Sequence, residues 1–223
     1  MTSVDASQVA SRVIEIRQRI TAAGGANIKL IAVTKTFDVG AMVAAFDAGC
    51  DGVGENYAQE LIAKSSALPT AKRLPIHFIG RLQSNKVKSI AELVDVWQSV
   101  DRVDLINEIA KRCVKADSDI RPKIMVQVNA TEEPDKGGCN PQEVSQLLDL
   151  ATAKGLEVVG LMTVGPTSNE PQQTQRAFRL ARKLGDGLGL KQGSMGMTGD
   201  LEIAIAEGST MIRIGSALFG PRS

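Results

Sequence analysis

Short apolar runs and amphipathic stretches alternate along the whole chain. The run from Leu30 to Val33 is too short for a helix and is uniformly apolar, as is typical of a parallel strand buried on both faces. Before it, Val9, Val13, Ile16 and Ile20 recur at helical spacing. The pattern therefore predicts one amphipathic N-terminal helix, followed by a first buried strand.

The same alternation continues to the end of the sequence. Strands are predicted at residues 30–33, 52–53, 76–79, 94–97, 123–128, 156–162, 190–194 and 211–214, and helices at residues 40–48, 57–66, 85–93, 104–115, 141–154, 172–188 and 200–207. Strict alternation favours parallel pairing through right-handed crossovers. Eight such units predict a single α/β domain over residues 1–223, a (β/α)8 barrel of the TIM type with an extra N-terminal helix. Because segment 190–194 has little apolar character, a doubly wound open sheet is the alternative.

Composition narrows the class of protein. With 43% hydrophobic and 23% charged residues, the 223-residue chain has the composition of a soluble globular domain of barrel size. A formal net charge of +1 predicts neither a nucleic acid nor a membrane surface as partner. No apolar stretch approaches the roughly 20 residues that span a bilayer, and the first residues do not resemble a signal peptide. The three cysteines, Cys50, Cys113 and Cys139, are widely spaced, so we expect reduced thiols and a cytoplasmic protein.

The sequence lacks the residues or motifs that several kinds of functional site require. One histidine, His77, and scattered cysteines do not supply a zinc site, so no metal is expected. His77 is predicted to be a hydrogen-bonded core residue. The sequence contains neither a nucleophile elbow nor a phosphate-binding P-loop. The pair Gly187 and Gly189 is interpreted as the end of a helix.

Lys35 stands just after the first predicted strand, in Ala32-Val33-Thr34-Lys35-Thr36. In a barrel, the carboxyl ends of the strands carry the functional groups. A lysine there is either a solvated loop residue or, if desolvated, an amine suited to form an imine.

Two glycine-rich loops follow the last two predicted strands. The first contains Ser194, Met195 and Gly196, and the second contains Gly215 and Ser216. Barrels often bind phosphate with these loops, because exposed backbone N–H groups and hydroxyls meet the anion there. The alternative is that the glycines only form tight turns.

Three further polar residues have two interpretations each. Arg213 interrupts an apolar strand, so it needs either an acidic neighbour on a helix or a ligand atom inside the barrel. Asn56 follows the second strand and could orient a ligand, although on its own it is better interpreted as a helix N-cap. Ser84 is likewise predicted to be an N-cap.

Taken together, six segments resemble a known family. They are Ala32-Val33-Thr34-Lys35, Gly54-Glu55-Asn56-Tyr57-Ala58-Gln59-Glu60, the stretch from His77 to Lys86, Gly160-Leu161-Met162-Thr163, Ser194-Met195-Gly196-Met197 and Arg213-Ile214-Gly215-Ser216. In this order they are similar to the pyridoxal 5'-phosphate (PLP) homeostasis protein family, also called the YggS or PROSC family. That family is similar in fold to the barrel domain of alanine racemase.

The resemblance implies a cofactor site. PLP would be held as a Schiff base on Lys35, its phosphate by Ser194, Gly215 and Ser216, and its pyridine nitrogen opposite Arg213. Asn56 would lie beside the ring, and Met195 and Gly196 would belong to the same binding loop. Thr198-Gly199 stands where serine is common in the family, and Gly193 replaces a larger apolar residue, which affects the fine geometry of the phosphate loop.

The resemblance also implies a role. We expect a monomeric, non-catalytic carrier or regulator that keeps free PLP low, hands it to PLP-requiring apo-enzymes and influences amino-acid and keto-acid pools. A PLP-dependent racemase or decarboxylase is the alternative, and a phosphosugar-binding barrel enzyme is a third. Racemases of this fold take a tyrosine from an additional β-domain, which we do not expect here, and the one tyrosine in the chain is Tyr57. An arginine opposite the pyridine nitrogen would also weaken carbanion chemistry.

Overall fold

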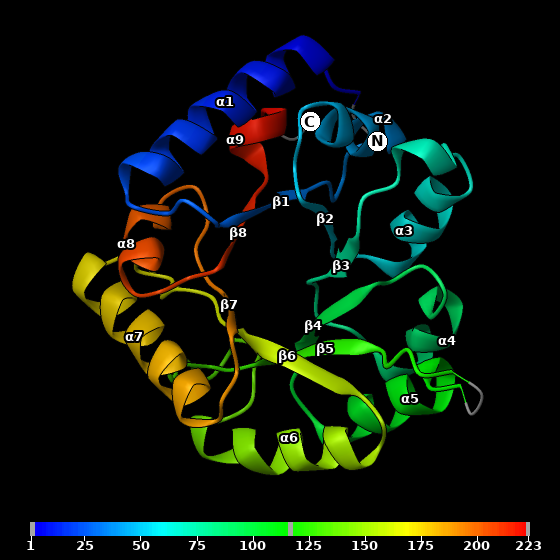
Figure 1. The fold of residues 1–223 in the computed structure, drawn as a ribbon, viewed down its shortest axis with the longest axis vertical. Helices are drawn as coiled ribbons and strands as arrows, with labels where there is room; N and C mark the ends of the chain where they lie inside the picture. The colour runs from blue at the N-terminus through cyan, green and yellow to red at the C-terminus, as the bar shows by residue number, and fades with distance from the viewer. Residues whose placement is uncertain (1–2, 116–117, 222–223) are drawn as a thin grey trace.

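The computed structural model describes residues 3–115 and 118–221 (Figure 1). Within these ranges the strands form one closed, all-parallel barrel in sequence order, β1 to β8. The strands are β1 (Lys29–Val33), β2 (Gly52–Glu55), β3 (Ile76–Phe78), β4 (Val96–Val100), β5 (Lys123–Gln127), β6 (Glu157–Met162), β7 (Gln192–Ser194) and β8 (Met211–Ile214). The predicted barrel is confirmed.

Barrel closure depends on the first and last strands. Ile31 of β1 is paired with Gly52 of β2 on one side and with Arg213 of β8 on the other. The weakly patterned segment near residue 192 does form a strand, which pairs with β6 and β8. An open doubly wound sheet would leave β1 and β8 apart, so that alternative is wrong.

Helices surround the barrel on the outside (Figure 1). They are α1 (Ala6–Ala22), α2 (Val39–Asp47), α3 (Ala58–Ser65), α4 (Val87–Ile90), α5 (Val103–Cys113), α6 (Val144–Ala153), α7 (Pro171–Gly187), α8 (Leu201–Ala206) and α9 (Ser216–Phe219), with short 3-10 turns at Thr70–Lys72, Ser84–Lys86 and Pro141–Glu143. The predicted apolar stripe of α1 is buried, and α1 packs against α2, α8 and α9. Gly189, with φ of 71°, follows the end of α7, as predicted.

The structure differs from the prediction around residues 84–97. The predicted helix 85–93 is a 3-10 turn at Ser84–Lys86 followed by the short α4, and β4 starts at Val96 rather than at residue 94. The reason is Asp95, whose carboxylate accepts hydrogen bonds from Ile76 N and Arg73 and so ends the turn before the strand begins. The short α9 was not predicted at all.

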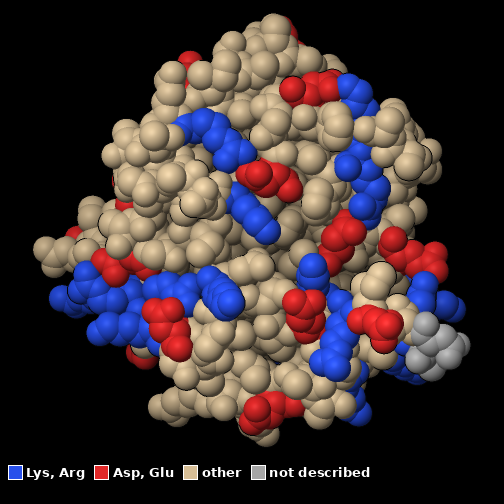
Figure 2. Space-filling view, viewed as in Figure 1, with Lys and Arg blue, Asp and Glu red and all other residues tan. Residues whose placement is uncertain are grey.

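The described surface carries both signs of charge. Figure 2 shows the face seen in Figure 1, where basic and acidic side chains are interspersed rather than separated. Among the described helices, none combines the length and apolar character needed to cross a bilayer. In the same ranges, His, Cys, Asp and Glu side chains form no group of three or more that could hold a metal ion.

Candidate functional site

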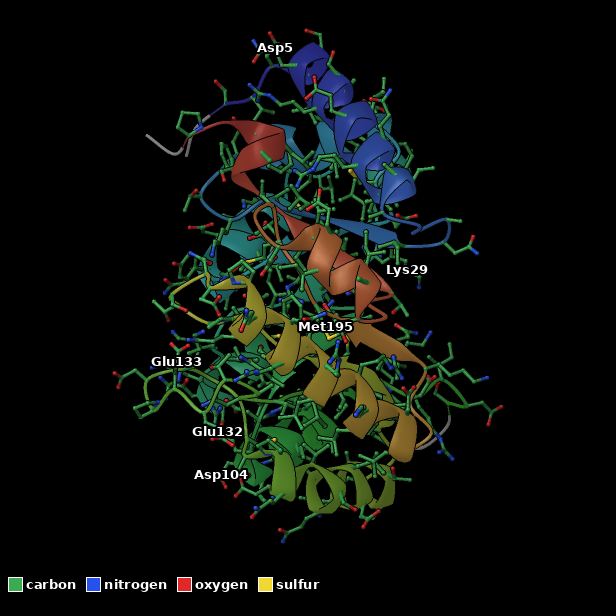
Figure 3. All side chains as sticks on the ribbon, turned by 90° about the vertical axis from the view of Figure 1, so that its left-hand side faces the viewer. Asp5, Lys29, Asp104, Glu132, Glu133 and Met195 are labelled. Carbon is green, nitrogen blue, oxygen red and sulfur yellow. The ribbon has the colours of Figure 1, made fainter. Side chains whose placement is uncertain are left out.

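The two ends of the barrel carry different residues. Lys29, at the start of β1, and Glu132 and Glu133, in the loop after β5, lie on opposite sides of the molecule (Figure 3). The predicted site residues all lie at or just beyond the carboxyl ends of their strands: Lys35, Asn56, Ser194, Met195, Gly196, Arg213, Gly215 and Ser216. The structure therefore gathers them at one end of the barrel, as the sequence predicted.

Lys35 is half-buried at the mouth of the barrel. It lies in the turn that follows β1, two residues beyond Val33, the last residue of the strand. Both neighbours of Lys35 are constrained. Thr34 Oγ1 donates a hydrogen bond of 2.5 Å to Glu55, and the backbone of Thr36 is left-handed, with φ of 71°. The position of Lys35 is thus fixed by the residues on either side of it.

Arg213 is the second cation of the site. It lies inside the barrel with 5% of its surface exposed, and it is registered opposite Ile31, so it starts deeper than Lys35. Nη1 donates to the carbonyl and hydroxyl oxygens of Ser194, both at 2.6 Å, and Nη2 donates to Thr163 O at 2.8 Å. Burial lowers the pKa of Arg213 to about 10, and attraction to Asp200 opposes this shift. Of the two interpretations of Arg213, the structure supports the inward one.

Below Arg213, a hydrogen-bonded chain crosses the barrel interior. Ser194 Oγ donates to Gln98 Oε1 at 2.7 Å, and Gln98 Nε2 lies 2.7 Å from His77 Nδ1. With the Gln98 oxygen facing Ser194, its amide nitrogen donates to His77, which leaves the ring proton on Nε2. Burial lowers the pKa of His77 to about 4, so the imidazole is neutral near pH 7. The predicted hydrogen-bonded core histidine is confirmed.

This chain limits what Ser194 can do. Its hydroxyl hydrogen is donated to Gln98 and its oxygen accepts from Arg213, so the described contacts occupy the hydroxyl. Ser194 stays a predicted phosphate residue, but these contacts favour an effect through Arg213. Met195 is buried in the hydrophobic core, and its backbone N–H and carbonyl bond Met211 and Ser209. Met195 therefore contributes to the packing of this loop against the core.

The loop after β7 is shaped by Gly196 and Asp200. Gly196 has φ of 95°, and a Cβ there would lie 2.5 Å from Ala204 Cβ, so a side chain does not fit. Met197 N donates to Asp200 Oδ1 at 2.5 Å, while burial raises the pKa of Asp200. The loop after β8 places Gly215 directly before α9 and leaves Ser216 exposed.

Asn56 is not a helix cap. Helix α3 begins at Ala58, the cap position belongs to Tyr57, and no side chain caps it. The cap prediction for Ser84 is also wrong, because Ser84 is the first residue of its 3-10 turn and Gln83 holds the cap position. Asn56 Oδ1 is instead buried and makes no hydrogen bond with any described residue. A buried polar atom in this state points to a partner that binding would supply.

Two large cavities lie at different ends of the barrel. One, of about 720 Å3, is at the mouth, where its lining includes Asn56, Tyr57 and Arg81. The other, of about 860 Å3, is at the strand starts, where its lining includes Lys29 and Pro75. Of the predicted site residues, Asn56 lines the first cavity and none lines the second.

The sequence did not reveal several residues that shape the site. Gln98, Thr163 and Asp200 contact or attract Arg213 or its partners, and Glu55 and Lys64 form a buried ion pair of 2.7 Å behind Lys35. A signal for this last pair exists. Glu55 follows Val53 at strand spacing and Lys64 follows Leu61 at helix spacing, so opposite charges occupy two positions that the pattern assigns to the core.

Comparison with known proteins places this geometry in a family. The alanine racemase N-terminal domain family matches residues 4–223. The pyridoxal phosphate homeostasis protein of Aquifex aeolicus is 36% identical over 98% of this chain and 99% of its own. The protein of the same name from Pseudomonas aeruginosa is 38% identical over 99% of this chain and 96% of its own.

Solved structures agree with these sequences. PipY of Synechococcus elongatus, solved with PLP bound, is 33% identical to this chain. The match covers 95% of this chain and 100% of the PipY chain, with a TM-score of 0.80. Alanine racemase from Corynebacterium glutamicum is 18% identical with a TM-score of 0.71 over 61% of its chain, a likeness of fold alone. On the strength of its sequence relatives, this chain belongs to the pyridoxal phosphate homeostasis protein family.

Proposed function

We propose that the chain binds PLP at the barrel mouth, as a Schiff base on Lys35, and acts as a non-catalytic carrier and regulator in vitamin B6 and amino-acid homeostasis. The observation that carries this proposal is that Lys35, just after β1, and Arg213, in the neighbouring strand β8, lie at the same end of the barrel. The names of the relatives and the PLP-bound PipY structure support it.

The donor set at the mouth suits this cofactor. Bound PLP would supply an aldehyde that condenses with an amine and a phosphate that anchors it. Arg213 makes its described hydrogen bonds to neutral oxygens, so its positive charge is available to an electron-rich ring atom. Gly215 and Ser216 would face the phosphate, and the buried, unpartnered Asn56 Oδ1 would face a polar atom of the ring.

We expect a non-catalytic role because the residues at the barrel mouth are poorly suited to the proton transfers that PLP enzymes need. With a pKa of about 10, Arg213 keeps its proton near pH 7, so it would leave the ring nitrogen unprotonated and the ring a poor electron sink. Racemisation also needs a second acid or base across the substrate carbon. Tyr57 is 53% exposed beside α3, and His77 is buried below Gln98. We therefore expect neither to serve as that acid or base.

The remaining features of the proposal concern the protein in the cell. We infer a cytoplasmic monomer that hands PLP to PLP-requiring apo-enzymes, with neither a membrane nor a nucleic acid as partner. The interspersed charges of the face shown in Figure 2 are compatible with such a protein.

Trapping the bound cofactor tests the proposal. Purified protein incubated with PLP should develop a visible Schiff-base band, and borohydride reduction followed by peptide mapping should place the label on Lys35. Lys35→Ala should lose the band, whereas Lys29→Ala, at the other end of β1, should keep it. Label on another lysine would contradict the site. The same preparation, incubated with amino acids in deuterated water, should show no repeated exchange at Cα; multiple turnovers would make the protein an enzyme.

A further inference from the structure

A charged cluster with a fully buried ion pair at its centre lies next to the Lys35 turn, between the barrel wall and α3. Lys64 is 1% exposed and Glu55 is 0% exposed. Lys64 Nζ donates to Glu55 Oε1 and to Thr34 O, both at 2.7 Å. The carbonyl it binds is the one that immediately precedes Lys35, so the cluster holds the backbone on the N-terminal side of that residue.

A second arm of the cluster holds the other side. Thr36 N donates to Glu60 Oε2 at 2.7 Å, and Glu60 lies 3.6 Å from Lys64 Nζ. Thr36 has φ of 71°, a left-handed conformation that β-branched residues rarely adopt and that costs on the order of 1–3 kcal/mol. Such a conformation persists only where the surrounding contacts impose it, and Glu60 provides that contact.

Stability alone does not account for this cluster. Burying two charges costs desolvation energy, and apolar residues of similar size often replace a buried ion pair without loss. The inner face of α3 already carries Ala58 and Leu61, so an apolar residue at 64 would continue the stripe. Glu55 Oε2 and Thr36 Oγ1 are buried and make no hydrogen bond with any described residue. The polar groups are thus retained at a cost, next to the residue that carries the proposed chemistry.

We propose that Glu55, Glu60 and Lys64 are positioning residues that fix the turn of Thr34, Lys35 and Thr36 and so aim the Lys35 amine into the barrel mouth. The proposal rests on the proposed function, because it concerns the reaction of Lys35 with PLP. In that reaction the neutral amine adds to the aldehyde carbon, a C=N bond forms, and the aldehyde oxygen leaves as water with the two amine protons. Its rate depends on where Nζ is held relative to the aldehyde, and a misplacement of about 1 Å costs roughly 100-fold.

The test separates imine formation from cofactor binding. The variant Glu55→Met/Lys64→Met removes both buried charges together, and Glu108→Gln/Arg112→Gln, which removes an ion pair on α5, is the matched control. Imine formation is followed by absorbance and borohydride trapping at a fixed PLP concentration. Binding without imine formation is measured with pyridoxine 5'-phosphate, which has an alcohol in place of the aldehyde. Urea unfolding reports stability.

We expect imine formation to slow by about 10- to 100-fold in the buried-pair variant. Affinity for pyridoxine 5'-phosphate should stay within about twofold, because the phosphate loops are on β7 and β8. The α5 control should behave like the unmodified protein in all three measurements. Imine formation at the unmodified rate, or an equal loss of pyridoxine 5'-phosphate binding, would overturn the positioning role.

A second variant keeps the test decisive if the double variant does not fold. Thr36→Gly adopts positive φ without strain and loosens the turn while leaving every buried charge in place. It should fold and should also form the imine more slowly, and an unchanged rate would contradict the proposal. Labelling of the unmodified protein separates a failure of the proposed function from a failure of the positioning role. If Lys35 takes no label, both are overturned. If Lys35 is labelled normally and the variants are unaffected, the positioning role alone is overturned.

Discussion

Lys35 and Arg213 come from neighbouring strands at the same end of the barrel, yet the protein surrounds them differently. Lys35 is half-buried on a loop with left-handed backbone beside it, and charged residues support that loop from behind. Arg213 is buried within a strand, and a chain of neutral groups, Ser194, Gln98 and His77, supports it from below.

The difference fits the two roles proposed for these residues. An amine that forms and releases a covalent bond must be reachable by the incoming aldehyde, so a half-buried position at the rim suits it. A guanidinium that only recognises a ligand atom must keep its charge and its direction, and neutral acceptors hold it without cancelling that charge. The following predictions test the Arg213 side of this comparison: Arg213 itself, the neutral chain below it, and the loop after β8.

The largest effect is expected at Arg213. Arg213→Ala should weaken PLP binding by roughly 100-fold, because hydrogen bonds to a charged group are each worth about 1.5–3 kcal/mol. It should also lower the free energy of unfolding by about 2–4 kcal/mol, since the buried carbonyls of Ser194 and Thr163 each lose the hydrogen bond that Arg213 donates. Arg179→Ala, which breaks an ion pair with Glu207 outside the site, is the control. PLP titration and urea unfolding measure both effects, and unchanged affinity would mean that Arg213 only supports the fold.

A smaller, pH-dependent effect is expected at the end of the neutral chain. Because burial lowers the pKa of His77 to about 4, below its ordinary 6.5, the unfolded state takes up more protons as the pH falls. The stabilising contribution of neutral His77 is complete above pH 6.5 and is lost towards pH 4. Between pH 7.5 and pH 5 this loss should amount to about 2 kcal/mol.

Urea unfolding at the two pH values checks this expectation. His77→Gln should remove that part of the pH dependence, whereas Asn85→Gln, a substitution of an exposed residue near β3, should leave it unchanged. If His77→Gln kept the full dependence, other groups would be responsible for it, and the chain below Arg213 would not be held by a neutral imidazole.

The smallest effect is expected at Ser216. Its side chain is exposed, so one hydrogen bond to phosphate is worth only about 0.5–1.5 kcal/mol. Ser216→Ala should therefore weaken PLP binding by roughly 2- to 12-fold, with no change in unfolding. The same variant should bind pyridoxal, which lacks the phosphate, as well as the unmodified protein does. A drop in pyridoxal affinity of the same size would show that Ser216 does not contribute to binding through the phosphate.

Local pattern was sufficient for the barrel, and it singled out Lys35 and Arg213 while leaving two interpretations open for each. Lys35 stands two residues after an apolar run and Arg213 interrupts one, so each is visible within a few residues of sequence. Gln98 was not visible in this way, because its importance comes from contacts with Ser194 and His77 on other strands. The caps proposed for Asn56 and Ser84 failed for a related reason: composition suggests a helix start, but its position shifts by a residue or two with tertiary contacts.

The closing pair of strands has a consequence for how the site comes into being. Lys35 follows β1 and Arg213 lies in β8, so the two meet only when the two ends of the barrel sequence have joined. Contacts between such distant segments form late and slowly during folding. A partly folded chain would accordingly lack the site, and a ligand that bridges β1 and β8 would favour the closed barrel by mass action. Colour gained during refolding in the presence of PLP would then mark the moment of barrel closure.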